Sequence, residues 1–567
     1  MKLILQHYLA SLRERDELDA VIPDLLSQLG LNVYSKPGRG TRQDGVDVAA
    51  VGKLSDDTEK VYLFSIKAGD LTRGDWDGDA LQSLRPSLNE ILDSYIPTKL
   101  PAEHKDKPIV ICLCFGGFVK EQVRSLVTNY VKNNTSKQIT FEEWNGDKLA
   151  DLIQEHFLRE ELLSPECQGV LRKSLALIDE PEVSHRHFVS LVTQLCSVEQ
   201  PKDKLMAIRQ IHLCLWIHFS WSRDANNVES TYLNAEVSLL HSWQIAKEEL
   251  NKKSKAAQSI KETLNAVIGL YLDISSLFIE KTVFPLTTTP HAISVSVGGP
   301  SEVDVNLRLF DLLGRLSMIA IWNYSTLQKM TEDDHEARRE VLVQLEKSTL
   351  AIVDMVKHNP TLNLPLKDDH AIDLTLALFP LLMRNETEQQ IRRWIDEILD
   401  RAEFAIRANG KYPSILRSYA ELLDHPTRSE DYFQEKTAAS ILYPMLGLAA
   451  QLINNSSLFA KLQTLKEKHL QHCNFQLWFP DESSENLLYT NSDLHGAALS
   501  DLDVKQPMQK FSELVFSECD HSNEFLELSA VQAGLWPIVL IACRYYRLPV
   551  PVHIFRDIYR ETLEEND

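Results

Sequence analysis

An aspartate and a lysine stand in two short apolar segments near the start of the chain, where a charged side chain needs either a partner or a chemical role. Asp47 lies in residues 43–48, and Lys67 ends the run 61–67. Alternate residues of a strand point to opposite faces, so we predict that Lys67 shares a face with Ser65 and two apolar side chains. An unpaired buried ammonium group costs several kcal/mol, so Lys67 is expected to be paired, to reach solvent or to take part in catalysis.

The same alternation predicts that Asp47, Ala49 and Val51 share one face of the preceding strand, with Val46 on the other face. If the two strands pair, Asp47 and Lys67 come close enough for a salt bridge. The other possibility is a metal site, because Mg²⁺ prefers carboxylate and carbonyl oxygens, and a nearby ammonium group can bind a phosphate or a water nucleophile. The residues alone leave both possibilities open.

The motif around these residues resembles that of a nuclease family. Asp-Gly-Val-Asp at residues 44–47, a strand, a loop and a second strand ending in Ile66-Lys67 are similar to the signature of PD-(D/E)xK nucleases in their Mrr-like restriction-endonuclease form. The resemblance implies an α/β restriction-endonuclease-like domain at 1–160, because the flanking segments over about 10–160 also follow the order of that family. They are a helix at 18–29, a strand at 31–34, a helix at 80–95, a strand at 109–114, a helix at 119–133, a strand at 139–144 and a helix at 148–157.

The resemblance implies metal-dependent hydrolysis of a phosphodiester, with DNA as the expected substrate and Mg²⁺ or Mn²⁺ as the cofactor. Asp47 would hold the ion, and Lys67 would orient the attacking water and offset charge on the phosphate. An acidic residue of the first helix would complete the ligand shell, with Asp19 as the first choice and Glu17 as the second. Gln82 matches a polar helix residue of related enzymes, although a solvated helix glutamine explains it equally well.

One position departs from the family pattern. The family usually has Glu, Asp or Gln two residues before the lysine, but this chain has Ser65, whose hydroxyl is a weak and uncharged ligand. Three explanations remain open. The carboxylate comes from Glu90 or Asp70 instead; the ion is held by Asp47, the Ile66 carbonyl and the acid of the first helix; or the site is inactive.

The charge of the chain bears on its binding partners. The formal net charge is −22, with 81 acidic and 59 basic residues, whereas affinity for nucleic acid rests largely on Lys and Arg. Residues 1–160 carry a net charge of only −5, so most of the acidic excess lies in the rest of the chain. We predict a local basic surface for DNA at Arg39, Arg42 and Arg73, with ordinary solvated loop positions as the alternative.

Cysteine usage and hydropathy indicate the compartment in which the protein works. The eight cysteines include no CxxC pair and stand mostly in apolar segments, as expected for reduced thiols in the cytoplasm. No stretch approaches the roughly 20 apolar residues of a membrane span. We therefore predict a cytoplasmic protein without a membrane partner.

From about residue 162 the pattern changes to long segments with apolar residues at helical spacing. We predict that 161–567 forms a large α-helical regulatory or interaction region of one or two subdomains. Residues 284–300 are the exception, and they predict a hairpin or a long surface loop. The clearest helices are expected at 307–322, 340–356, 371–383, 389–405 and 440–452.

The resemblance implies a bacterial endonuclease, in a setting of defence against foreign DNA. The acidic helical region would control cleavage by covering the DNA-binding face, by binding a protein partner or by forming homo-oligomers. The alternative is a catalytically inactive nuclease fold that serves as a scaffold while the helical region binds a protein partner. Ser65 and the negative net charge both favour this alternative.

Overall fold

The protein forms two compact units in the computed structural model, which describes residues 2–12, 14, 18–35, 44–54, 58–78, 83–156, 165–197, 201–331, 334–491, 493 and 495–564. The first unit comprises residues 1–234 and 254–263, and the second comprises 235–253 and 264–567. The domain boundary expected at residue 160 falls within the first unit, which holds helices on both sides of that position.

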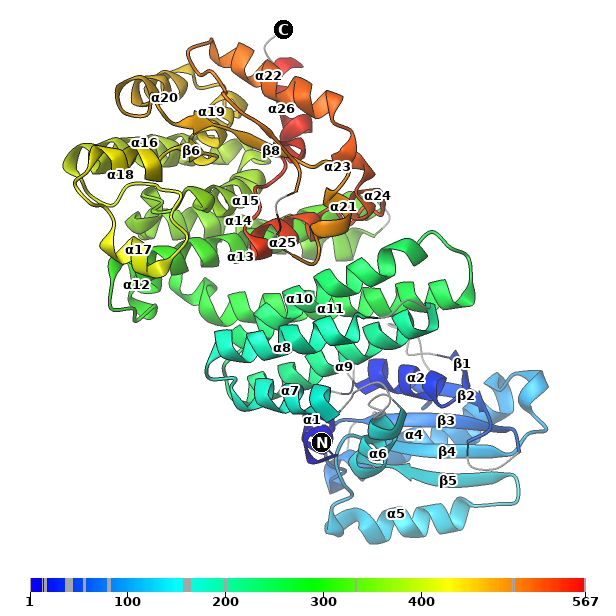
Figure 1. Ribbon diagram of the computed structural model, residues 1–567. Coiled ribbons are helices and arrows are strands. Elements are labelled where there is room, and N and C mark those ends of the chain that lie inside the picture. Colours follow the sequence, from blue (N-terminus) through cyan, green and yellow to red (C-terminus); the bar gives the residue numbers. More distant parts are fainter. Residues whose placement is uncertain are drawn as a thin grey trace. The chain divides into compact units, whose positions relative to one another are not determined.

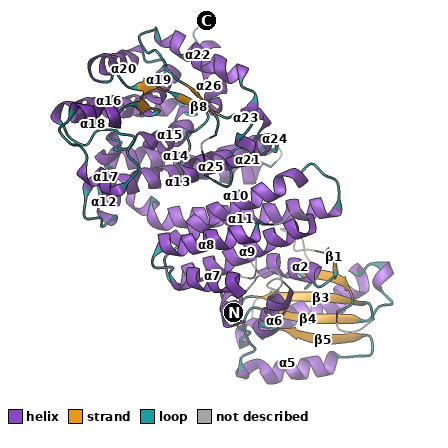
Figure 2. Cartoon of the chain, viewed as in Figure 1, coloured by secondary structure: helices purple, strands orange, loops and turns teal. Residues whose placement is uncertain are grey.

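A five-stranded mixed sheet lies at the centre of the α/β part of the first unit, as predicted for an α/β domain (Figures 1 and 2). The strands lie in the order β1-β2-β3-β4-β5. β2 is antiparallel to both β1 and β3, whereas β4 runs parallel to β3 and to β5. Their bounds are β1 Asn32–Ser35, β2 Val48–Gly52, β3 Lys60–Lys67, β4 Ile109–Phe115 and β5 Ile139–Trp144.

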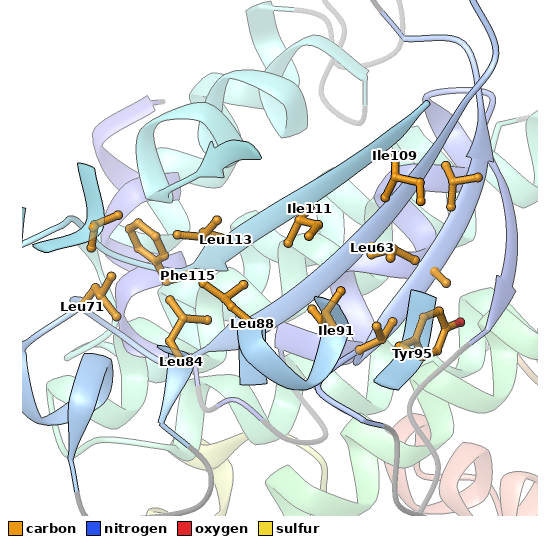
Figure 3. Close-up of a cluster of buried hydrophobic side chains, with 14 of the residues drawn as sticks. Leu63, Leu71, Leu84, Leu88, Ile91, Tyr95, Ile109, Ile111, Leu113 and Phe115 are labelled. Atoms are coloured by element: carbon orange, nitrogen blue, oxygen red, sulfur yellow. The ribbon is translucent and has the colours of Figure 1, made fainter. Parts of the chain in front are cut away.

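Helices cover the sheet, so its central strands are buried and read as nearly continuous apolar runs. All residues of β4 are buried. On one face, Leu63 and Ile111 belong to a core cluster with Leu88 of α4 (Leu84–Glu90) and with apolar residues of the π-helix η2 (Ile91–Lys99). Figure 3 shows these side chains between the strands and the two helical segments.

Further helices of the first unit surround the sheet and continue beyond it. α2 contacts β1 and β2, α6 contacts β5, and α7, α8 and α9 contact one another. α10 (Glu229–Ala246) and α11 (Lys255–Thr282) each belong partly to both units. The other bounds are α1 Lys2–Ser11, α2 Asp19–Gln28, α3 Arg73–Asp77, η3 Ala102–His104, α5 Glu121–Asn134, α6 Gly146–His156, α7 Pro165–Ala176, α8 Pro181–Leu195 and α9 Pro201–Asp224.

A buried polar cluster joins α8, α9 and α10 within the first unit. One ring nitrogen of His218 lies 3.1 Å from the Ser184 hydroxyl, and the other lies 2.7 Å from the Thr231 hydroxyl. Burial lowers the pKa of His218 to about 3. The imidazole is therefore neutral in the folded protein and acts as a hydrogen-bonding link between helices.

We expect the first unit to lose stability as the pH falls below about 6.5. The unfolded chain protonates His218 near its ordinary pKa of 6.5, whereas the folded chain resists protonation until the pH approaches 3. The unfolded state binds more protons in this window, so each pH unit removes about 1.4 kcal/mol from the free energy of unfolding for such a histidine. Urea unfolding from about pH 7 to about pH 5 tests this, because His218→Asn should reduce the pH dependence. Equal slopes for the two proteins would contradict the assignment.

The second unit is mainly helical, which confirms the prediction for this part of the chain (Figure 2). The five segments expected as its clearest helices overlap α13, α14, α15, α16 and α19. Two small two-stranded sheets complete it, β6-β7 and β8-β9. The bounds are η4 Lys247–Glu249, η5 Phe284–Leu286, α12 Ala292–Ser296, α13 Glu302–Lys329, α14 His335–His358, η6 Pro360–Asn363, η7 Asp368–His370, α15 Ala371–Leu382, η8 Asn385–Thr387, α16 Glu388–Ala408, α17 Tyr419–Asp424, α18 Glu430–Lys436, β6 Ala439–Ser440, α19 Leu442–Leu452, α20 Ser456–His469, β7 Asn474–Phe475, β8 Leu477–Phe479, α21 Ser484–Leu487, β9 Ala497–Leu499, α22 Met508–His521, α23 Glu524–Glu527, α24 Ser529–Gln532, α25 Pro537–Tyr546, η9 Val552–Phe555 and α26 Arg556–Glu564.

The prediction for residues 284–300 is partly wrong, because the segment forms no hairpin and two short helices interrupt its turns. This segment forms the 3-10 helix η5 and the short helix α12, with turns between and after them. Ile293 of α12 is fully buried, and α12 contacts α13. The β-branched residues favour an extended chain by propensity, but burial of Ile293 in the helical unit overrides that preference.

Two further predictions concern the cysteines and membrane spans. All eight cysteines are free thiols, and seven of them are buried. Burial raises the pKa of the thiols of Cys214 and Cys473 to about 12, so these side chains are protonated and unreactive at neutral pH. Within the described part of the chain, no helix has both the length and the apolar character that a membrane crossing needs.

Candidate active site

Lys67 and Asp47 lie at the same end of the sheet. Lys67 is the last residue of β3 and stands beside Phe115, the last residue of β4. Asp47 immediately precedes β2, whose first residue, Val48, pairs with Phe64 of β3. Because β2 and β3 are antiparallel, the beginning of β2 meets the end of β3. The structure thus brings the predicted acid and the predicted lysine to neighbouring strands at one edge.

A tight turn before β2 fixes the position of Asp47. Asp44 and Gly45 have positive φ angles of 49° and 81°. A Cβ atom on Gly45 would lie 2.0 Å from the backbone oxygen of Ser87, so this position requires glycine. After the turn, Asp47 Oδ2 accepts a hydrogen bond of 2.7 Å from the Ile66 N–H.

The predicted alternation of faces around Asp47 is correct only within the strand itself. Ala49 and Val51 belong to one core cluster, as expected, but Val46 belongs to the same cluster and not to the opposite face. The strand begins at Val48, so Asp47 lies in a bend that precedes the regular alternation. The Asp47 carboxylate therefore contacts the backbone of β3 at the edge of the sheet.

The ion partner of Lys67 differs from the one expected. Lys67 is 8% exposed, and its Nζ lies 3.1 Å from Glu14 Oε1. Among the described residues, Lys67 pairs with Glu14 and not with Asp47. Glu14 follows α1, whose end approaches the sheet so closely that a Cβ atom on Gly116, just after β4, would lie 1.9 Å from the Leu9 oxygen. The approach of α1 to this edge accounts for the nearness of Glu14 to Lys67.

Glu14 is absent from the predicted site although the sequence carries a signal for it. Leu5, Leu9 and Leu12 stand at helical spacing and are buried, which indicates a helix before the one expected at 18–29. With that helix recognised, Glu14 becomes a candidate acid on the same grounds as Asp19.

The other predicted site residues have varied positions. Asp19 begins α2 and Glu90 ends α4; both are half-buried, and among the described residues the ion pair of Lys67 is with Glu14 instead. Arg73 is exposed at the beginning of α3. The remaining four lie outside the described residues: Glu17, Arg39, Arg42 and Gln82.

Asp70, the other acid considered as a replacement ligand, holds together the segments that follow β3 and β4. Its Oδ1 accepts a hydrogen bond of 2.8 Å from the Phe118 N–H, and its Oδ2 lies 2.6 Å from Lys120 Nζ. The hydrogen bond from Lys120 lowers the pKa of Asp70. These contacts explain the position of Asp70 without a metal ion.

Ser65 takes the place of the carboxylate that the family pattern has before the lysine. It is fully buried, and its hydroxyl has no hydrogen-bond partner among the described residues. A buried hydroxyl without a partner costs about 1–3 kcal/mol. Ser65 therefore contributes no charge to the site and no evident stability to the sheet.

Ser65→Ala is expected to leave the free energy of unfolding unchanged or to raise it by up to about 1 kcal/mol, because it removes an unsatisfied buried group. Ser184→Ala is the matched control, since the Ser184 hydroxyl is buried and donates to the Ser174 carbonyl at 2.7 Å. That substitution should lower the free energy of unfolding by about 1 kcal/mol or more. Urea unfolding measures both, and an equal loss in the two variants would show that Ser65 has a partner.

The negative charge of Asp47 affects the ionisation of a cysteine in β4. Burial raises the pKa of the Cys114 thiol, and the charge of Asp47 raises it further. Cys114 pairs with Ile66 in the sheet. The carboxylate is therefore close to both central strands at this edge, where a bound cation would also feel its field.

The oxygens near Lys67 fit one kind of metal ion better than others. They are the Asp47 carboxylate, which accepts from the Ile66 N–H, the carbonyl of Ile66, the residue before Lys67, and the Glu14 carboxylate, which pairs with Lys67. Within the described ranges, no group of three or more His, Cys, Asp and Glu side chains is arranged to hold a metal. Mg²⁺ prefers oxygen ligands, keeps several waters and often uses one or two carboxylates. The donor set thus suits Mg²⁺ or Mn²⁺ with water in the other positions.

Comparisons of the chain with protein-family models, with curated proteins and with solved structures find no match.

Proposed function

We propose that the α/β part of the first unit is a Mg²⁺- or Mn²⁺-dependent nuclease that hydrolyses phosphodiester bonds of DNA. One observation carries the proposal: Asp47 and Lys67 lie at one edge of neighbouring strands, and Asp47 is hydrogen-bonded to the N–H of the residue before Lys67. The resemblance of residues 44–67 to the Mrr-like nuclease signature supports the same reaction.

Each residue at this edge would have its own role in hydrolysis. Asp47 and the Ile66 carbonyl would hold the ion. When bound, Mg²⁺ supplies a Lewis acid for a phosphoryl oxygen and lowers the pKa of a bound water. Lys67 offers a positive charge to the phosphate, and Glu14 orients its ammonium group at 3.1 Å. Because Lys67 is largely buried, its charge is less screened than one at the surface.

The resemblance also supports a bacterial setting of defence against foreign DNA, with cleavage controlled by the helical part of the chain. Residues 161–567 carry a net charge of −17, which repels DNA and leaves binding to local basic groups of the α/β part, such as Arg73. A protein partner or a second copy of the chain bound to the helical region would then supply the control.

Two observations favour a second candidate, a catalytically inactive nuclease fold that serves as a scaffold. Ser65 supplies no carboxylate, and the charge of Lys67 is balanced by Glu14. On this alternative the edge of the sheet is a structural ion pair, and protein binding by the helical region is the function.

The deciding experiment is incubation of the purified full-length chain with supercoiled plasmid, linear duplex, single-stranded DNA and RNA, with Mg²⁺, Mn²⁺ or EDTA. Asp47→Asn is the inactive comparison, because the amide keeps the hydrogen-bonding shape and removes the charge. Metal-dependent cleavage that is lost in Asp47→Asn supports the nuclease. Equal cleavage by both proteins, or none by the wild type under any of these conditions, favours the scaffold.

A further inference from the structure

A groove of about 610 Å³ lies in the second unit between α14, α16 and η6. Its walls come from the last turns of α14 and from one face of α16. On α16 the lining residues recur every three or four positions from Gln389 to Arg401, so the groove follows a single stripe of that helix. A cavity of this size matches those that hold small organic ligands in other proteins.

Three cations line the groove in a chain that has an excess of acids. Lys357 and Arg393 make no ion pair or hydrogen bond within the described ranges of the chain, and both are exposed. Arg401 pairs with Glu397 at 3.3 Å. Asp354 is the other acid in the wall. The lining therefore has a net positive charge and two cations available to an anion.

The apolar side chains of the lining form what we call the floor of the groove. Val353, Val356, Leu381 and Trp394 line it. Trp394 is 3% exposed, and its Nε1–H donates a hydrogen bond of 3.1 Å to the Leu362 carbonyl, which fixes the indole ring. An apolar floor beside charged groups favours a ligand that has both an organic body and an anionic end.

We propose that this groove binds a nucleoside phosphate. The phosphate would lie between Lys357 and Arg393, because Arg forms paired hydrogen bonds with phosphate oxygens and Lys adds a mobile positive charge. The nucleoside would cover the apolar floor beside Trp394. Amide groups of Gln389 and Asn363 in the same lining offer donors and acceptors to the base or ribose. The site is independent of the α/β edge and of any nuclease activity.

Calorimetric titration of the full-length chain with ATP, AMP, pyrophosphate and adenosine tests the proposal. Buffers with EDTA and a Lys67→Met background remove binding at the α/β edge from the measurement. We expect ATP or AMP to bind more tightly than pyrophosphate and adenosine, because only the nucleotides engage both the cations and the floor. Arg393→Ala and Lys357→Ala should each weaken nucleotide binding by about 10- to 100-fold.

Arg392→Ala is the matched control, because Arg392 is the exposed neighbour of Arg393 on α16 and does not line the groove. It should leave the affinity unchanged. Thermal unfolding of all three variants confirms that they are folded. No binding of ATP or AMP by the wild type, equal weakening in Arg392→Ala and Arg393→Ala, or pyrophosphate binding as tight as that of ATP would each overturn the proposal.

Discussion

Replacement of Lys67 with methionine is expected to lower the rate of metal-dependent DNA cleavage by at least about 100-fold. Methionine keeps an unbranched side chain of similar shape in the buried position at the end of β3, so the fold should survive. It removes the positive charge that the proposed mechanism places against the phosphate. The effect is measured by comparing the initial rates of plasmid nicking by the wild type and the variant at saturating Mg²⁺.

Lys60→Met is the matched control for Lys67→Met. Lys60 begins the strand that Lys67 ends, so it lies at the opposite edge of the sheet, and its replacement should leave the rate unchanged. Glu14→Gln adds a further test, because it removes the charge that faces Lys67 and leaves an amide of the same shape. If Lys67→Met and Glu14→Gln both lower the free energy of unfolding while cleavage continues at the wild-type rate, the pair is structural and Lys67 leaves the proposed site.

The position of Lys67 could be predicted from the sequence because it depends on local patterns. The alternation of 61–67 fixes which residues share a face, and antiparallel pairing then brings the start of β2 to the end of β3. Asp47 shows the limit of that reasoning. Its place is set by the turn at Asp44 and Gly45 and by a hydrogen bond to Ile66 across the strands, which propensity and alternation do not encode.

The sequence makes Glu14 a candidate partner of Lys67 but does not select it over other acids. Glu14 lies 53 residues away along the chain, and several acids at the start of the sequence have equal claim to the position by composition. Only the packing of α1 at the end of β4, where Gly116 admits the Leu9 carbonyl, selects Glu14. The same limit applies to the helical part of the chain. The spacing of apolar residues predicts its helices, but it does not predict which helices pack against each other.

Buried ion pairs of the second unit show which helices pack together. Removing one of them is expected to have the largest effect on stability. Arg544 of α25 is 5% exposed and forms an ion pair with Glu236 of α10, which is fully buried and 308 residues away along the chain. Arg544 also lies 3.0 Å from Asp311 of α13. One guanidinium group therefore joins three helices of the unit.

Arg544→Ala is expected to lower the free energy of unfolding of the second unit by about 3–5 kcal/mol, because Glu236 would remain buried without this counter-ion. Arg560→Ala is the control, since Arg560 is 55% exposed and lies 3.6 Å from Asp520. A surface pair of that kind contributes less than about 1 kcal/mol. Denaturant unfolding compares the two, and Arg544→Met combined with Glu236→Gln should recover part of the loss, because the uncompensated charge is gone.

The difference in free energy of unfolding between the wild type and Arg544→Ala should depend on pH if the ion pair with Asp311 contributes to it. Burial alone would raise the pKa of Asp311, but Arg315, Arg544 and Arg308 lower it to about 2. In the unfolded chain an aspartate has a pKa of about 3.9, so the stability that Asp311 contributes is fully present above that pH and is lost as the pH falls toward 2. The advantage of the wild type over Arg544→Ala should therefore shrink between about pH 4 and about pH 2. A constant difference across this range would leave the packing of the Arg544 side chain as the cause, because the contribution of an ion pair with a carboxylate, such as the one with Glu236, is also lost on protonation.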